Sequence, residues 1–181
     1  MSLTLTFTSS GRYACPGLGS TRDLAVFRDL GLDPRLEQRG CSDCPVFTSC
    51  HMSHWTQMAV EISDIPALRT AAEQLGCTWQ VGGTGRGYSR NTLSGDFVLR
   101  TDRLGCPYDI VASKNAATGK LNLATDWWQG HVERVVGKDY GRLLQHYGIA
   151  KATIAARAKG YTTSRAIQAN GDIKLEIHLP A

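Results

Sequence analysis

Three cysteines in the ten residues "CSDCPVFTSC" (41–50) constrain the fold of this chain more than any other feature. Cys41, Cys44 and Cys50 follow a C-x2-C-x5-C pattern, and Cys15 lies upstream. Residues 1–51 hold four of the six cysteines but few consecutive apolar residues. A segment of about fifty such residues does not bury a sufficient core unaided. We therefore expect a bound metal to supply the missing folding free energy.

The spacing predicts which ligands would meet at one inorganic centre. A two-residue gap turns Cys41 and Cys44 toward the same ion or cluster face, and a five-residue gap lets Cys50 reach across a cluster. With Cys15 the four thiolates form a complete ligand set for a [4Fe–4S] cluster or for Zn²⁺. The [4Fe–4S] cluster is the leading prediction, and zinc is the alternative.

Other donors could complete either site. His51 or His54 could replace a cysteine at a zinc ion, because zinc accepts imidazole nitrogen. Cys77 begins a predicted strand and Cys106 lies in a Gly-Cys-Pro turn, so both are predicted to be buried, inert thiols. They are also the substitutes if Cys15 is not a ligand.

The sequence indicates a protein of a reducing compartment, and we predict a cytoplasmic location. Its start, "MSLTLTFTSSGRYACPG", lacks the basic and apolar regions of a signal peptide. No apolar run approaches the ~20 residues that cross a bilayer, so no membrane association is expected.

Positive charge is concentrated in one part of the chain. The formal net charge is +4, and residues 138–165 contain one acidic residue, Asp139. A modest basic surface there could contact nucleic acid. The residues predicted for that contact are Lys138, Arg142, Lys151, Arg157 and Lys159.

Hydrophobic periodicity after residue 51 predicts an α+β fold, a mainly antiparallel sheet with two helices on one face. We divide the chain into a cysteine-rich metal-binding segment, 1–51, and an α+β domain, 52–181. A helix is predicted over 64–76, capped by Asp64, and a longer one over 137–160 with a break at Gly148. A closing hairpin turns at Asn170-Gly171. Strands are predicted at 56–62, 77–81, 96–101, 108–113, 120–125, 163–169 and 172–179.

Three further motifs carry weaker signals. The glycine-rich stretch 82–89 lacks the lysine of a phosphate-binding loop and is interpreted as a mobile loop. Trp127 and Trp128 lie beside His131, and one of the two tryptophans could form a partner surface. Asp109 and Asp126 fall on different predicted strands, and nothing in their spacing indicates an acid/base pair. No nucleophile–base arrangement is evident, so the sequence leans away from an enzyme.

The chain resembles known families over two segments. From Met52, "MSHWTQMAVEISDIPALRTAAEQLG" is similar to the start of the hypothetical chloroplast reading-frame thirty-five family, a domain of unknown function. The resemblance continues through "GYSRNTLSGDFVLRTDRLGCPYDIVAS" to "NGDIKLEIHL", covering about 52–179. It brings no established activity, but implies a ferredoxin-like protein or an AAA+ ATPase as partner.

The front segment resembles the ligand pattern of WhiB-like regulators. These have one distant cysteine, a helical spacer and C-x2-C-x5-C around a [4Fe–4S] cluster, but their tryptophan-glycine turn is missing here. We therefore expect an iron–sulfur protein that transfers electrons, senses redox state or serves as an accessory subunit. The alternative is a zinc-stabilised module that binds nucleic acid or acts as an adaptor.

Overall fold

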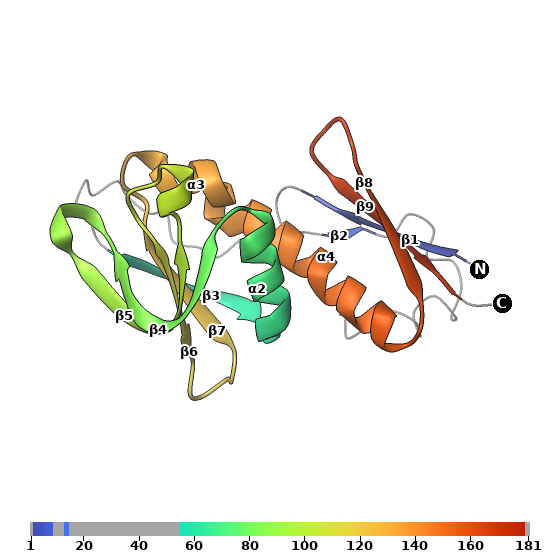
Figure 1. Ribbon diagram of the computed structural model, residues 1–181, viewed down its shortest axis with the longest axis horizontal. Coiled ribbons are helices and arrows are strands. Elements are labelled where there is room, and N and C mark those ends of the chain that lie inside the picture. The colour runs from blue at the N-terminus through green and yellow to red at the C-terminus, as the bar shows by residue number, and fades with distance from the viewer. Residues whose placement is uncertain (1, 9–12, 15–54, 180–181) are drawn as a thin grey trace, which may run out of the picture. The chain divides into compact units, whose positions relative to one another are not determined.

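The computed structural model describes residues 2–8, 13–14 and 55–179, which form a mixed α+β fold with antiparallel sheets (Figure 1). The predicted fold class is confirmed at this level. The strands form two sheets where one was expected. The chain divides into two compact units, unit 1 (Met1–Ser49 and Leu144–Ala181) and unit 2 (Cys50–Leu143). The predicted boundary at residue 51 lies outside the described residues and stays a prediction.

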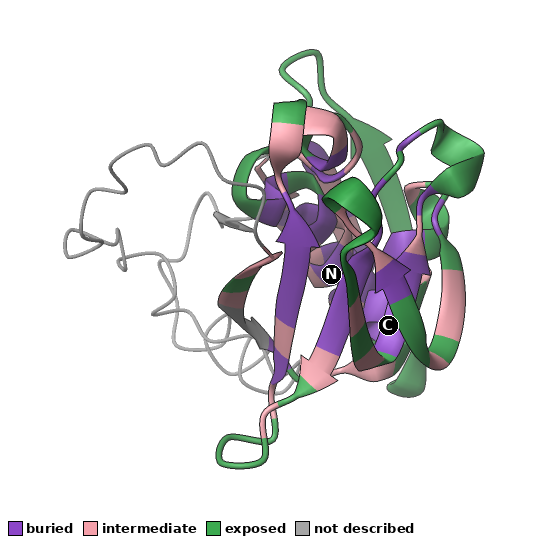
Figure 2. Ribbon diagram, turned by 90° about the vertical axis from the view of Figure 1, so that its left-hand side faces the viewer, coloured by how far each residue is buried: buried purple, intermediate pink, exposed green. Residues whose placement is uncertain are grey.

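Unit 2 is built on a five-stranded sheet in the order β3-β7-β6-β5-β4, and every neighbouring pair is antiparallel. Burial is greatest on β6 and β7, inside the sheet, and the tip of their hairpin is exposed (Figure 2). The predicted strands of this unit all form, with shifted ends. Their bounds are β3 Trp55–Ile62, β4 Thr78–Arg86, β5 Thr92–Arg100, β6 Ile110–Lys114 and β7 Leu121–Asp126.

The glycine-rich stretch after Val81 corrects one prediction. Residues 82–86 are not a loop, because β4 runs through them to Arg86 and pairs with β5; a loop follows only from Gly87 to Asn91. A Cβ added at Gly85 would lie 2.5 Å from one methyl of Val111, and one at Gly95 would lie 2.4 Å from the other. These glycines therefore allow Val111 to pack directly onto the backbones of two strands.

Helix α2 (Ile65–Gln74) begins where the sequence predicts. The Asp64 side chain caps it by accepting a hydrogen bond from the Ala67 amide at 2.9 Å, and Pro66 occupies the first turn. Its buried face consists of Ala67, Leu68, Ala71 and Ala72. Gly76, with a φ of 85°, follows the helix end. Helix α3 (His131–Val136) is a shorter element further along the unit.

Unit 1 contains a four-stranded antiparallel sheet in the order β2-β1-β9-β8. The predicted hairpin with the Asn170-Gly171 turn forms β8 and β9, whereas β1 is a strand that the sequence analysis did not identify. The bounds are β1 Ser2–Phe7, β2 Tyr13–Ala14, β8 Thr162–Ile167 and β9 Ile173–His178.

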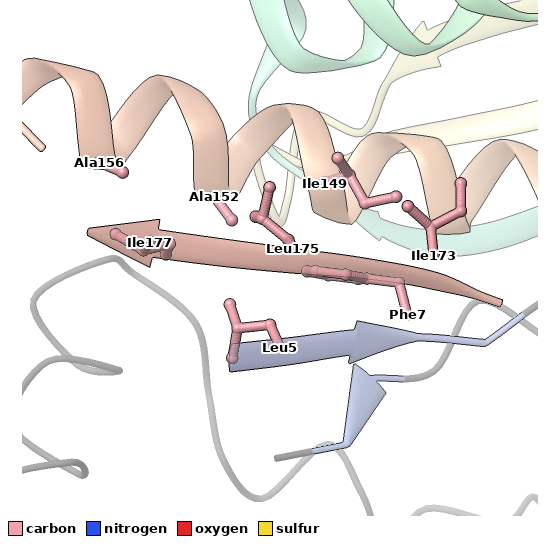
Figure 3. Packing of buried hydrophobic residues seen from close by; sticks show 8 residues of the cluster. All are labelled: Leu5, Phe7, Ile149, Ala152, Ala156, Ile173, Leu175 and Ile177. Atoms are coloured by element: carbon pink, nitrogen blue, oxygen red, sulfur yellow. The ribbon is translucent and has the colours of Figure 1, made fainter. Parts of the chain in front are cut away.

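Helix α4 (Gly141–Ala158) covers this sheet with small and aliphatic side chains (Figure 3). The helix is continuous through Gly148, so the predicted break is wrong. A Cβ at Gly148 would lie 2.7 Å from the Phe7 ring, which explains a glycine inside a helix. Ile154 is exposed, because a different stripe of α4, spaced three and four residues apart, faces the sheet. The cluster comprises Leu5, Phe7, Ile149, Ala152, Ala156, Ile173, Leu175 and Ile177.

A polar contact also fixes α4 to the sheet of unit 1. The buried Gln145 amide nitrogen donates to the Phe7 carbonyl at 2.8 Å and to the Gly171 carbonyl at 3.1 Å. Both acceptors are backbone oxygens at strand ends. Across 2–8, 13–14 and 55–179, no helix combines the length and apolar character needed to span a membrane.

Candidate functional site

The predicted metal ligands Cys15, Cys41, Cys44 and Cys50 lie outside the described residues, as do His51 and His54. Their convergence therefore stays a prediction. In the part of the chain that is described, no group of three or more His, Cys, Asp or Glu side chains could hold a metal ion.

Cys77 and Cys106 are described, and both are buried free thiols, as the sequence predicts. Burial raises the pKa of the Cys77 thiol to about 12, with smaller electrostatic contributions from neighbours that include Asp109. The Cys106 thiol donates to the Tyr108 carbonyl at 3.3 Å. With so high a pKa, the Cys77 thiol is protonated at neutral pH and is therefore a poor nucleophile. Whether either replaces Cys15 stays a prediction.

Asp109, fully buried before β6, is the most heavily hydrogen-bonded side chain of the unit 2 core. Arg86 donates from Nε at 2.9 Å, from Nη2 at 2.9 Å and from its backbone amide at 3.0 Å. Arg100 Nη1 donates at 3.0 Å and the Thr101 amide at 3.1 Å. Burial alone raises the pKa of Asp109, but these hydrogen bonds outweigh it and hold the pKa below its usual value. Because donors surround both oxygens, we assign Asp109 a structural role.

Asp126, also buried, connects two loops of unit 2. Its Oδ2 accepts from the Tyr88 amide at 3.0 Å, and its Oδ1 accepts from the Trp128 amide at 2.9 Å. The Tyr88 and Trp128 rings lie 5.3 Å apart. Ser89 (φ 51°) and Gln129 (φ 54°) next to them adopt left-handed backbone conformations, which cost about 1–3 kcal/mol each outside glycine. Asp126 thus holds two strained loops together.

The tryptophan pair is divided between two environments. Trp127 packs edge-on against the buried Tyr140, with ring centroids 4.9 Å apart. Trp128 instead contacts Tyr88 in the loop. Both indoles are half-buried, so the predicted division into one core and one surface tryptophan is not observed.

A pocket of about 390 Å³ lies in unit 2 beside helix α3. Its walls come from the end of α2, from residues 104–106 between β5 and β6, from α3 and from the first turn of α4. Cys106, His131, Arg134 and Arg142 all line it, and no carboxylate does. We call it the α3 pocket.

Hydrogen bonds to fixed acceptors position the cationic side chains of the α3 pocket. Arg134 donates from Nη2 to His131 Nδ1 at 3.1 Å and from Nε to the Gly130 carbonyl at 3.4 Å. Arg142 Nη1 donates to the carbonyls of Arg134 and Val135 at 3.3 and 3.4 Å.

Both ring nitrogens of His131 have hydrogen-bond partners. A guanidinium has no acceptor, so His131 Nδ1 accepts from Arg134 Nη2. His131 Nε2 lies 3.3 Å from Gln129 Oε1, to which it can donate. The ring also packs edge-on against Tyr108, with centroids 5.5 Å apart. The two guanidinium groups of Arg134 and Arg142 supply permanent positive charge to the pocket.

Sequence reasoning named two of these three residues for other reasons and missed Arg134. His131 was noted beside the tryptophans, and Arg142 was assigned to a nucleic-acid surface. The i, i+3 spacing of His131 and Arg134 on one helix is the signal that pairs them. Their approach to Cys106 depends on tertiary packing and has no sequence signal.

The remaining predicted nucleic-acid residues are distributed over both units. Lys138 is exposed in unit 2, and Arg157 and Lys159 are exposed in unit 1. Lys151 is half-buried and has an interaction partner. Six residues separate Lys151 from Arg157 on α4, which places them about 120° apart around the helix axis. They do not form one stripe.

No protein-family model, curated protein or solved structure matches this chain. The two family resemblances therefore stay predictions. No relative lends an activity to the α3 pocket or to the cysteines.

Proposed function

We propose that the protein binds one [4Fe–4S] cluster through Cys15, Cys41, Cys44 and Cys50 and uses it to transfer electrons or to sense redox state. The observation that carries the proposal is the ligand pattern itself, one upstream thiolate followed by C-x2-C-x5-C. Four thiolates are the usual ligand set of this cluster.

The environment of the other two cysteines is compatible with this ligand set. Cys77 and Cys106 are buried in unit 2, and neither belongs to a described group of metal donors. Burial raises the pKa of the Cys77 thiol to about 12, which disfavours the thiolate that a metal requires and supports a ligand set drawn from the other cysteines.

The α+β domain 52–181 would then be an accessory module in the cytoplasm. Its partner would be a ferredoxin-like protein or an AAA+ ATPase, as the resemblance implies. Capture of such a partner by the cluster-containing full chain, and weaker capture after cluster removal, would support this role. Equal capture by both forms would favour an adaptor without redox chemistry.

Metal analysis of protein purified without oxygen tests the cluster. We expect about four iron and four sulfide per chain, with the broad visible absorption of thiolate-bound iron. Cys44→Ser should lower the iron content, whereas the matched control Cys77→Ala should retain it. A colourless protein with one equivalent of zinc would contradict the proposal.

A second candidate is a zinc-stabilised module that binds nucleic acid. The observation favouring it is that α4 carries Arg142, Lys151 and Arg157 but no acidic residue. Binding of duplex DNA should then weaken steeply with salt. Lys and Arg side chains that contact phosphates displace counterions from the DNA, and added salt opposes that release. The double variant Arg157→Glu/Lys159→Glu should reduce binding, whereas Lys114→Glu in unit 2 should not. Equal losses in both variants would contradict a specific surface.

A further inference from the structure

We propose that the α3 pocket binds a small organic anion, a phosphate or carboxylate attached to an apolar group. The site lies wholly in unit 2 and is independent of the metal proposal. We infer this from the positive charge of the pocket, from the hydrogen-bonded positions of its two arginines and from the apolar part of its wall.

The positive charge of the pocket is not neutralised by the described residues. Elsewhere in unit 2, Arg86 and Arg100 both pair with Asp109, and Arg69 pairs with Glu73. Arg134 and Arg142 bond only carbonyl oxygens and one imidazole nitrogen. Two guanidinium groups therefore face the same space without a carboxylate partner among the described residues, which favours an anion.

Both arginines are exposed and have further donors to offer. Each guanidinium has five N–H bonds. Among the described residues, Nη1 of Arg134 and both Nε and Nη2 of Arg142 have no acceptor. The existing contacts with backbone carbonyls orient both guanidinium groups at the pocket, where these donors can meet an anion.

The remaining wall favours a ligand with an apolar part. Leu75, Leu104 and Val135 line the pocket, and Leu104 is 40% exposed although it is a large aliphatic residue. The volume of about 390 Å³ lies at the lower end of the range of small-molecule sites. A ligand that covers Leu104 while its anionic group meets the arginines would satisfy both surfaces.

The site is suited to binding and not to covalent chemistry. Cys106 is buried, and its thiol donates to a carbonyl instead of facing a base. His131 has both ring nitrogens occupied by Arg134 and Gln129. A nucleophile–base pair is therefore not formed by these residues.

Titration of the full chain with phenyl phosphate and with benzoate, followed by NMR and calorimetry, tests the proposal. Benzyl alcohol is the neutral control of similar shape. We expect saturable binding of at least one anion, shifts of the His131 ring resonances and no saturation with benzyl alcohol. The stronger of the two anions identifies phosphate or carboxylate as the preferred group.

Charge-matched variants locate the binding. Arg134→Gln and Arg142→Gln should each weaken it about tenfold, the effect of losing one charge-assisted hydrogen bond. Arg90→Gln removes the same charge from an exposed side chain outside the pocket and should change affinity less than about twofold. Since Arg142 also bonds the end of α3, Arg142→Lys provides a second variant that keeps the charge but removes the planar fork.

Two results would overturn the proposal. One is the absence of saturable binding for both anions with folded protein. The other is an equal loss of affinity in Arg90→Gln and Arg134→Gln, which would show attraction to net charge alone.

Discussion

Replacement of Asp109 by asparagine should destabilise unit 2 by about 3 kcal/mol. Removing one partner of a buried ion pair costs about 3–5 kcal/mol, because the remaining charge is left uncompensated. Here Arg86 and Arg100 are 42% and 28% exposed, so water can partly solvate them after the change. Asparagine also keeps one acceptor oxygen. Both effects place the loss at the lower end of the range.

The pH dependence of this loss has a defined sign. The folded-state pKa of Asp109 lies below the ordinary value of 3.8, so its stabilisation is fully present above that pH. As the pH falls through the folded-state pKa, the carboxylate is protonated and the stabilisation is lost. Asparagine cannot titrate, so the difference between the two proteins should shrink on acidification.

Urea unfolding followed by tryptophan fluorescence measures the effect in unit 2 alone. All four tryptophans, Trp55, Trp79, Trp127 and Trp128, lie in that unit. For a unit of this size, Cys50–Leu143, a loss of about 3 kcal/mol corresponds to a fall of about 12–24 °C in melting temperature. Asp102→Asn is the matched control, because Asp102 is exposed, and it should change stability by less than about 0.5 kcal/mol. Equal stability of the two variants at pH 7 would refute the structural role of Asp109.

Three other predictions concern packing and thiol chemistry. Gly148→Ala should destabilise unit 1 by about 1–3 kcal/mol in denaturation followed by circular dichroism, because the added methyl meets Phe7 at 2.7 Å. In a Phe7→Ala background this cost should largely disappear. If the double variant instead lost the sum of the two single losses in unfolding free energy, the contact would be contradicted. Tyr140→Phe should leave stability unchanged or raise it by about 1 kcal/mol, since the buried hydroxyl has no hydrogen-bond partner among the described residues; a loss of about 1 kcal/mol would contradict this reasoning. Cys77, with a pKa of about 12, should resist iodoacetamide at pH 8 until the chain is unfolded, as peptide mass spectrometry can measure; rapid native labelling would disprove its burial.

The sequence predicted correctly those helices and hairpins whose ends are set by a capping residue or a turn pair. The Asp64 cap defines the start of α2, and Asn170-Gly171 defines the β8–β9 turn. Two errors arose where packing overrides local preference. The glycines of β4 resemble a loop until the Val111 side chain that they accommodate is known. Gly148 similarly resembles a helix break until Phe7 fills the space beside it.

The sequence predicted the α3 pocket less well than it predicted the helices and strands. The α3 pocket joins residues from the end of α2, the β5–β6 loop, α3 and α4, and no spacing relates them. The alternation of Leu5 and Phe7 with threonines did carry a strand signal. The pairing of β1 with β9 has no local signal, because the two strands lie at opposite ends of the sequence.

The pairing of β1 with β9 places a demand on biosynthesis. Ser2 aligns with His178 and Phe7 with Ile173, so the ribosome must translate nearly the whole chain before this ladder can form. Unit 2 is contiguous from Cys50 to Leu143 and can complete its sheet earlier. During that interval the backbone N–H and C=O groups of β1 that later pair with β9 have no strand partner. A strand in this state can be bound by a chaperone or can pair wrongly with another chain.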